Sequence, residues 1–202
     1  AGEVAAAPRV RDLANDDCLE IITVSRLDRE KNPLLLVDIA AELRRLLPER
    51  RFRLRIVGDG PMSEQLAARI GEFELADCVE LLGYVPYGPQ LSALYNSSDI
   101  FLHVSHTEGL PQVLIEAMAH GVPLVATAVG GVVALLAGTE AAVVAPGDAV
   151  AAAQALTELA TDKSLRLAGA TAGLQRAAEL TIEAQQSAVL AHFASMHDRL
   201  LA

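Results

Sequence analysis

Short apolar runs alternate with longer segments of helical periodicity along most of the chain. Runs rich in Val, Ile, Leu and Phe, bounded by polar or turn-forming residues, predict buried strands. Six such strands are expected, at residues 19–24, 52–57, 79–82, 100–103, 124–126 and 142–144. Strand and helix in alternation predict an α/β fold, a Rossmann-like parallel six-stranded sheet with helices on both faces.

The segment between the first two strands predicts a helix, with Asn32 as its cap and Pro33 at its first position. Its apolar face carries Leu36, Ile39, Ala40, Leu43 and Leu47. Further helices are expected after Pro61, Pro89 and Pro111. Sheets of this kind bind ligands beyond the carboxyl ends of their strands, so the loops after the strands are where chemistry is expected.

The alanine-rich residues 1–18 lack a regular pattern and are predicted to be a leader or linker. Residues 19–202 form one predicted domain, in which 181–202 is an amphipathic terminal helix capped by Thr181. The stripe of this helix consists of Ile182, Val189, Phe193, Met196 and Leu200. Because the chain begins with Ala1 rather than methionine, we interpret it as a fragment of a longer protein.

Residues 117–139 contain no acidic side chain, no Lys and no Arg, and are long enough to span a bilayer. However, Pro123 and four glycines interrupt the segment where a spanning helix would have none. A strand at 123–126, a turn at Gly130 and Gly131, and a helix at 132–137 fit it better.

Composition excludes several classes of protein. A chain that is 52% hydrophobic and 21% charged can build a core, which excludes intrinsic disorder. A net charge of −10, 3% aromatic residues and no tryptophan argue against nucleic acid as a partner. Cys18 and Cys78 are predicted to be free thiols, since the chain has no CxxC pair. No clustered histidines and no Asp-x-Asp pair are present, so no metal site is expected.

The loop after the first strand carries Arg26 and Lys31. An arginine fork and a lysine point charge beside the mouth of the sheet would suit a diphosphate. The alternative is that both side chains simply belong to a polar turn with Arg29 and Glu30. The loop after the second strand, at 58–61, resembles a dinucleotide fingerprint but has Ser63 in place of the third glycine, which favours a tight turn over NAD binding.

The loop after the fourth strand leads to a helix whose first turn is marked by Pro111. The backbone amides of Gln112, Val113 and Leu114 are expected to face the crevice and form an anion site. Gly109 would let the backbone approach a ligand closely.

Two glutamates and two histidines accompany this helix. Glu108 stands in the loop, and Glu116 lies on an apolar helix face, where two ribose hydroxyls would satisfy its carboxylate. The alternative for Glu116 is a position facing solvent. His103 and His106 are candidates for acid–base chemistry or for purely structural roles.

Together these segments resemble the carboxy-terminal, donor-binding domain of a GT-B retaining glycosyltransferase of family four (glycosyl transferases group 1). The resemblance runs from about residue 20 to residue 148. It rests on 25–27 with Lys31, on 57–61, 82–85, 98–100, on the Glu108–Glu116 pair, and on 121–123, 130–131 and 146–148. The sequence departs from the family pattern at Ala134, where a glutamate is usual, and at Ala141, where glycine is common.

The resemblance implies specific roles. Arg26 and Lys31 would bind the diphosphate and steady the leaving group, and Glu108 would contact the transferred sugar, so these three are the implied catalytic residues. Glu116 would hold the ribose. The implied remaining donor-binding residues are Gly109, Leu110, Gln112 and Val113 around the sugar and phosphates, and Tyr84 and Val85 around the base. Arg26, Lys31 and Glu116 are therefore expected around one common pocket.

The implied reaction is transfer of a hexose from a UDP-sugar or GDP-sugar to an acceptor, with retention and without a metal or other cofactor. The amino-terminal acceptor domain of the family is absent from the chain, so we expect nucleotide binding but little or no transfer. The family further implies a cytoplasmic protein, with peripheral association of the full-length protein with the inner face of the membrane. A homodimer through the terminal helix is a further expectation. The alternatives are a non-catalytic nucleotide-sugar-binding module and a nucleotide-sugar epimerase of similar GT-B-like fold.

Overall fold

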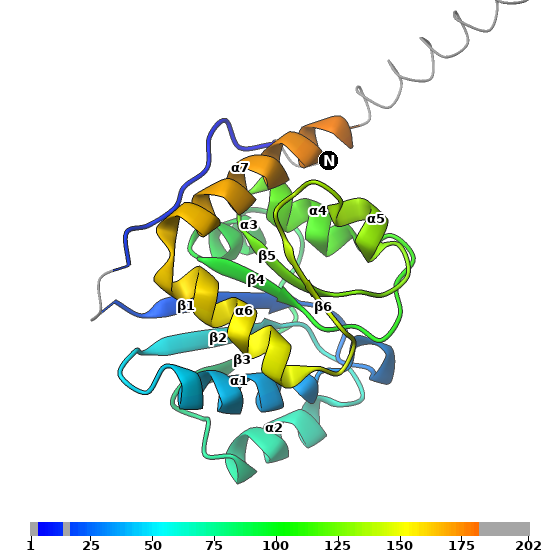
Figure 1. Ribbon diagram of the computed structural model, residues 1–202. Helices are drawn as coiled ribbons and strands as arrows, with labels where there is room; N and C mark the ends of the chain where they lie inside the picture. Colours follow the sequence, from blue (N-terminus) through cyan, green and yellow to red (C-terminus); the bar gives the residue numbers. More distant parts are fainter. Residues whose placement is uncertain (1–3, 14–16, 182–202) are drawn as a thin grey trace, which may run out of the picture.

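The computed structural model describes residues 4–13 and 17–181 and contains one parallel six-stranded sheet (Figure 1). All six predicted strands are confirmed. They are β1 (Leu19–Val24), β2 (Phe52–Val57), β3 (Val79–Gly83), β4 (Ile100–His103), β5 (Leu124–Thr127) and β6 (Ala142–Val144). Their order across the sheet is β3-β2-β1-β4-β5-β6.

The strand order reverses between β1 and β4. From β1 the chain builds outward to β2 and β3, and then returns to place β4 on the other side of β1, where Ile21 pairs with Ile100. The loops that follow β1 and β4 therefore leave the same edge of the sheet in opposite directions. Such a switch point is where open α/β sheets bind their ligands.

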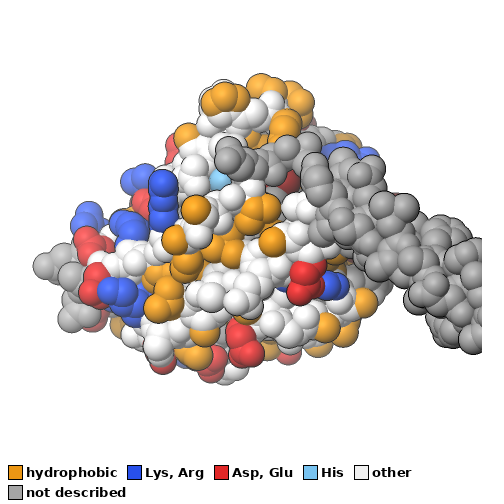
Figure 2. Space-filling view, turned by 90° about the horizontal axis from the view of Figure 1, so that it is seen from above, with side chains coloured by type: hydrophobic (Ala, Val, Ile, Leu, Met, Phe, Trp, Pro, Cys, Tyr) orange, Lys and Arg blue, Asp and Glu red, His pale blue; other side chains and the backbone are white. Residues whose placement is uncertain are grey.

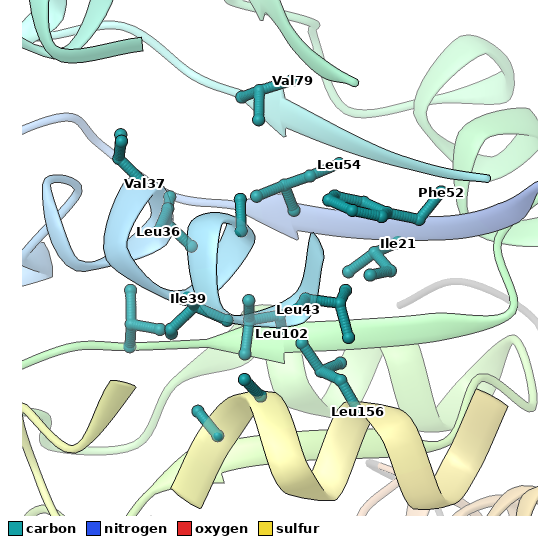
Figure 3. Close-up of a cluster of buried hydrophobic side chains, with 14 of the residues drawn as sticks. Ile21, Leu36, Val37, Ile39, Leu43, Phe52, Leu54, Val79, Leu102 and Leu156 are labelled. Carbon is teal, nitrogen blue, oxygen red and sulfur yellow. The ribbon is translucent and has the colours of Figure 1, made fainter. Parts of the chain in front are cut away.

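Helices cover both faces of the sheet, as predicted (Figure 1). Their bounds are α1 (Leu35–Leu46), α2 (Ser63–Glu72), α3 (Pro89–Asn96), α4 (Gln112–Ala119), α5 (Val132–Leu136), α6 (Ala149–Thr161) and α7 (Lys163–Glu179). One core lies under α1, α2 and α6, where Leu36, Leu43 and Leu156 meet strand residues such as Leu102 (Figure 3). A second core lies under α3, α4, α5 and α7.

The start of α1 differs from the prediction. Asn32 has a left-handed backbone with φ of 50°, and the helix begins at Leu35, so Asn32 is not its cap and Pro33 is not its first residue. The reason is a short 3-10 turn, η1 (Arg29–Lys31), which is capped by Asp28 and reverses the chain at Asn32. Asparagine tolerates this conformation better than most residues. Four of the five predicted apolar positions are buried in α1; Leu47 follows its end.

Residues 117–139 form the end of α4, β5, a glycine turn and α5, which confirms the strand, turn and helix prediction. Within the described parts of the chain, no helix is long and apolar enough to cross a membrane. Both cysteines are free, and Cys78 is buried. The predicted terminal helix lies outside the described residues apart from Thr181.

Much of the predicted leader lies against the domain. The Ala5 amide donates to the carbonyl of Ala119 (2.8 Å), and Arg11 Nε donates to Asp99 Oδ1 (2.8 Å). The guanidinium of Arg166 also donates to the carbonyl of Arg11 (3.2 Å). The described residues before β1 are thus tied to α4, to α7 and to the turn that precedes β4.

Candidate functional site

The loop that follows β1 is built by close approach of two backbones. A Cβ on Gly58 would lie 1.8 Å from the carbonyl oxygen of Ser25, and one on Gly60 would lie 2.5 Å from that of Leu27. The Leu27 amide donates to the carbonyl of Asp59 (2.9 Å). The glycines at 58–61 therefore serve a tight turn, as the sequence indicated, and that turn supports the loop that carries Arg26 and Lys31.

Lys31 and Glu108 meet at the switch point between β1 and β4. Lys31 Nζ lies 2.7 Å from Glu108 Oε1, and only 18% of the lysine side chain and 9% of the glutamate side chain are exposed. An ion pair this well shielded from water is screened little by salt. The structure thus brings two of the three implied catalytic residues into direct contact.

Two further donors converge on the same oxygen of Glu108. The Ser105 hydroxyl donates to Oε1 (2.6 Å), and His103 Nε2 lies 3.0 Å from it. His103 and Ser105 are two positions apart at the end of β4, so their side chains leave the same face of the extended chain. The Thr127 hydroxyl in β5 holds the carbonyl of Ser105 (2.8 Å) and fixes this arrangement from the neighbouring strand.

Burial and hydrogen bonding set the charges of this cluster. Burial alone would raise the pKa of Glu108, but the hydrogen bonds from Lys31, Ser105 and His103 outweigh it, and the pKa lies below its ordinary value. Burial lowers the pKa of His103, with partial opposition from Glu108. At neutral pH the glutamate is therefore ionised and the histidine is neutral, with its Nε2–H donated to the carboxylate. This geometry gives His103 a supporting contact with Glu108; His106 is exposed.

The turn after β5 closes over the Glu108 loop. Gly130 has φ of 48°, and a Cβ there would lie 1.8 Å from the carbonyl oxygen of Glu108. A Cβ on Gly131 would lie 2.1 Å from the carbonyl oxygen of Gly109. Both glycines are required by close backbone contact, which holds Glu108 and Gly109 in place beside α4.

The amino end of α4 differs in one respect from the expectation. Pro111 is extended and α4 begins at Gln112, but the Leu114 amide donates to the carbonyl of Pro111 (3.2 Å). The expectation that Leu114 offers its amide to a ligand is therefore wrong, because the first turn closes on itself. The amides of Gln112 and Val113 have no acceptor within the helix, and Leu110 is exposed in the loop before them.

Glu116 is half-buried on α4 and does not simply face solvent. Its Oε2 accepts a hydrogen bond from the hydroxyl of Tyr95 in α3 (3.0 Å). It lines a hollow of about 410 Å³, the α4 hollow, together with Tyr87, Gln112, Ile115, His120 and Leu180 among others. On the face of the molecule seen from above, hydrophobic side chains gather across the middle (Figure 2).

Arg26 lies in a different depression. The β1–β2 hollow, of about 470 Å³, is lined by Val24, Ser25, Arg26, Val57, Gly58, Asp59, Tyr84 and Val85. The Arg26 side chain is 73% exposed and its guanidinium lies 3.1 Å from Asp28 Oδ2. The three residues expected around one common pocket do not line a single hollow: Arg26 lines the β1–β2 hollow and pairs within its own loop, Glu116 lines the α4 hollow, and Lys31 is paired with Glu108.

One loop joins the two hollows. Tyr84 and Val85 line the β1–β2 hollow, and Tyr87 of the same loop lines the α4 hollow. The implied base-binding residues thus stand at the boundary between the Arg26 side and the Glu116 side of the site. In the described ranges 4–13 and 17–181, no group of three or more His, Cys, Asp or Glu side chains is placed to hold a metal ion.

Ser105 and Tyr95, which hold the two glutamates, were not predicted from the sequence. Ser105 carried a usable signal, since it lies two residues after His103 and three before Glu108, so a turn brings all three together. For Tyr95 the sequence offered only a general signal, since a tyrosine on a buried helix face needs a partner for its hydroxyl.

Comparison with known proteins identifies the family of the chain. Residues 8–176 match the family described as Glycosyl transferases group 1. The chain is 35% identical over 150 residues to the amylovoran biosynthesis glycosyltransferase AmsK of Erwinia amylovora, covering 70% of this chain and 36% of the relative. It is 31% identical over 183 residues to the D-inositol 3-phosphate glycosyltransferase of Pseudarthrobacter chlorophenolicus, covering 85% of this chain and 43% of that protein.

Solved structures share the fold. The C-terminal domain of a glycosyl transferase group 1 family protein (LpcC) from Francisella tularensis superposes with a TM-score of 0.71 at 21% identity, over 80% of this chain and 85% of that one. Anabaena Alr3699/HepE, solved in complex with UDP and glucose, gives 0.72 at 26% identity, over 88% of this chain and 48% of that one. The chain spans less than half the length of the two curated relatives. On the match over residues 8–176, the chain belongs to the glycosyl transferases group 1 family and forms one α/β domain of the GT-B type.

Proposed function

We propose that this chain is the donor-binding domain of a glycosyltransferase that moves a hexose from a nucleoside diphosphate sugar to an acceptor, with retention. The observation that carries the proposal is the shielded Lys31–Glu108 pair at the β1/β4 switch point, directly before the amino end of α4. At this place a cation and free helix amides can donate to phosphate oxygens, and a carboxylate can accept from sugar hydroxyls. The HepE structure, which contains UDP and glucose, supports UDP as the nucleotide.

In this proposal each part of the donor has its own contacts. Lys31 and the amides of Gln112 and Val113 bind the diphosphate, and Arg26 adds positive charge from the β1–β2 hollow. Glu108, beside Gly109 and Leu110, accepts from hydroxyls of the transferred sugar. Lys31 and the two amides act where negative charge accumulates on the diphosphate as the bond between the sugar and the phosphate breaks, and they are fixed before the reaction begins.

The nucleoside part of the donor contacts Glu116 and the loop of Tyr84 and Val85. Glu116 accepts from the ribose hydroxyls in the α4 hollow, and the backbone around Tyr84 and Val85 holds the base. Because every base has a polar edge that backbone groups can contact, these residues set affinity more than the choice between UDP and GDP.

Both relatives extend well beyond the part that this chain matches. We therefore propose that the chain alone binds the donor and transfers sugar poorly, and that the acceptor is bound by a second domain. We also propose that the protein is cytoplasmic and that the full-length protein associates with the inner face of the membrane.

Calorimetry with UDP, GDP, ADP and inorganic pyrophosphate tests the function. The expected result is binding of UDP or GDP at least about tenfold tighter than pyrophosphate, since ribose contacts to a carboxylate add at least about 1.4 kcal/mol. Glu116→Gln is expected to remove this advantage. Glu158→Gln, at an exposed position of α6, is the matched control and should leave every affinity unchanged. Equal affinity of the wild-type chain for pyrophosphate and every nucleotide would contradict the proposal.

A further inference from the structure

Tyr95 is a fully buried tyrosine whose side-chain hydroxyl points at Glu116. The residue is 1% exposed, at the end of α3, and its hydroxyl donates to Glu116 Oε2 (3.0 Å). Burial, together with the adjacent carboxylate, raises the pKa of Tyr95 far above its ordinary value. The phenol therefore keeps its proton at neutral pH and can donate it to Oε2 of Glu116.

The ring of Tyr95 is held from two directions. It stacks on the His120 ring, with centroids 4.9 Å apart and planes at 22°, and lies against Phe101 with centroids 5.9 Å apart. His120 Nδ1 in turn lies 2.7 Å from the carbonyl oxygen of Glu116 and donates to it. The side chain and the backbone of Glu116 are thus both tied to one aromatic pair, which leaves the tyrosine little freedom to move.

This contact decides which oxygen of Glu116 is available. Oε2 is occupied by Tyr95, and in the described part of the chain Oε1 has no hydrogen-bond partner. Because Glu116 lines the α4 hollow, the oxygen left over is the one that can meet a ligand there. Tyr95 therefore selects the orientation of the carboxylate as well as satisfying it.

Tyr95 also fixes a distance between two walls of the site. It is the seventh residue of α3, which starts at Pro89 directly after the loop that carries Tyr84, Val85 and Tyr87. Its bond to Glu116 connects that helix to α4. The loop proposed to hold the base and the glutamate proposed to hold the ribose are therefore coupled through one hydroxyl group.

We propose that Tyr95 is a positioning residue for recognition of the ribose: its hydroxyl orients the Glu116 carboxylate so that one oxygen faces the ribose hydroxyls in the α4 hollow. This inference rests on the proposed function. It assigns to α3 a role in nucleotide selectivity that does not require contact between Tyr95 and the ligand.

The test compares UDP with 2′-deoxy-UDP, because the two differ only in one hydroxyl that Glu116 would hold. Wild type is expected to bind UDP about tenfold tighter than 2′-deoxy-UDP, as for one hydrogen bond to a charged group. Tyr95→Phe keeps the ring and loses only the hydroxyl, and is expected to reduce that ratio to about two and UDP affinity about fivefold. Pyrophosphate binding should not change.

A matched control separates positioning from general loss of a buried hydroxyl. Thr139 is also 1% exposed and donates to a backbone carbonyl, but it lies between α5 and β6 and lines neither hollow. Thr139→Val should keep the wild-type ratio of UDP affinity to 2′-deoxy-UDP affinity. Circular dichroism should show that both variants are folded.

The outcomes are distinct. If Tyr95→Phe keeps the wild-type preference for UDP over 2′-deoxy-UDP while Glu116→Gln loses it, the role of Tyr95 is overturned and the proposed function stays intact. A wild-type ratio in Glu116→Gln overturns the role of Tyr95 together with the ribose contact. A wild-type chain that binds UDP and 2′-deoxy-UDP equally, or binds neither, overturns the inference as well, and absence of all nucleotide binding removes the proposed function with it.

Discussion

The two glutamates of the site are eight residues apart and are held in opposite ways. Glu108 receives three donors on one oxygen, one of them the Lys31 cation, in a shielded cluster at the end of β4. Glu116 receives a single neutral donor, Tyr95, at the wall of an apolar hollow. The first carboxylate is thus paired with a cation of the protein itself, whereas the second is oriented by a neutral donor and has one oxygen left for a ligand.

The difference has consequences for stability. Removing one member of a shielded ion pair leaves the other charge without compensation, which costs far more than the pair itself contributes. Removing the charge of Glu116 leaves a neutral amide beside a neutral phenol. The Glu108 cluster is therefore expected to matter for folding and for binding, and Glu116 for binding alone.

The largest effect is expected for Lys31→Met. Loss of the cation removes charge-assisted bonds to phosphate, so UDP and pyrophosphate should both bind roughly thirtyfold weaker, equivalent to about 2 kcal/mol. Calorimetry with both ligands measures this. Arg29→Met is the control, because Arg29 is an exposed cation of the same loop that lines neither hollow. A loss confined to UDP would show that Lys31 does not act on the phosphates.

The next effect is on stability. Lys31→Met should lower the free energy of unfolding by about 2 kcal/mol, and adding Glu108→Gln should restore at least half of it, since the unpaired charge is then gone. Glu116→Gln alone should change it by less than about 0.5 kcal/mol. Urea denaturation measures all three. Additive losses in the double variant, or an equal loss in Glu116→Gln, would remove the contrast between the two glutamates.

A smaller effect is expected in the dependence of stability on pH. Because burial lowers the pKa of His103 from its ordinary 6.5, the unfolded chain takes up that proton first, and stability should fall as the pH falls below about 6.5. Glu108, whose pKa is lowered from 4.5, adds a second loss below about pH 4.5. His103→Gln keeps a donor near Nε2 but does not titrate. In this variant the free energy of unfolding, measured by urea denaturation at several pH values, should change less between about pH 5 and 6.5 than in wild type. An unchanged slope would exclude His103 as the source of the pH dependence in this range.

The smallest effect is expected for Arg26→Ala. The side chain is 73% exposed and already paired with Asp28, so its loss should weaken the binding of UDP and of pyrophosphate by only about two- to threefold. The loss should be greater at low salt and vanish near 1 M salt, where screening is short-ranged. Calorimetry at two salt concentrations checks it. A loss as large as that of Lys31→Met would mean that Arg26 moves into the site when a ligand binds.

The sheet could be predicted because each strand is a short apolar run closed by turn residues, and the order of such runs fixes a parallel fold. The start of α1 could not, because the turn at Asn32 depends on the cap that Asp28 gives to η1. The pairing of Arg26 with Asp28 and the bond from Tyr95 to Glu116 are side-chain choices across loops or helices. No periodicity along the chain encodes them.

The sequence named candidate residues for the site but did not define how they are arranged. Lys31 and Glu108 do meet, because the β1 and β4 loops leave the sheet at its switch point. Arg26 and Glu116 line separate hollows, because one is held within its own loop and the other faces α3. Motif spacing identifies the residue types, whereas the partner that each side chain chooses is a property of the packed structure.

A crystal structure of this chain with UDP tests the account most directly. Phosphate oxygens are expected within hydrogen-bonding distance of Lys31 Nζ, and ribose hydroxyls at Glu116 Oε1, with the Tyr95 hydroxyl still on Oε2. UDP bound with its ribose away from Glu116, or with its phosphates away from Lys31, would contradict it.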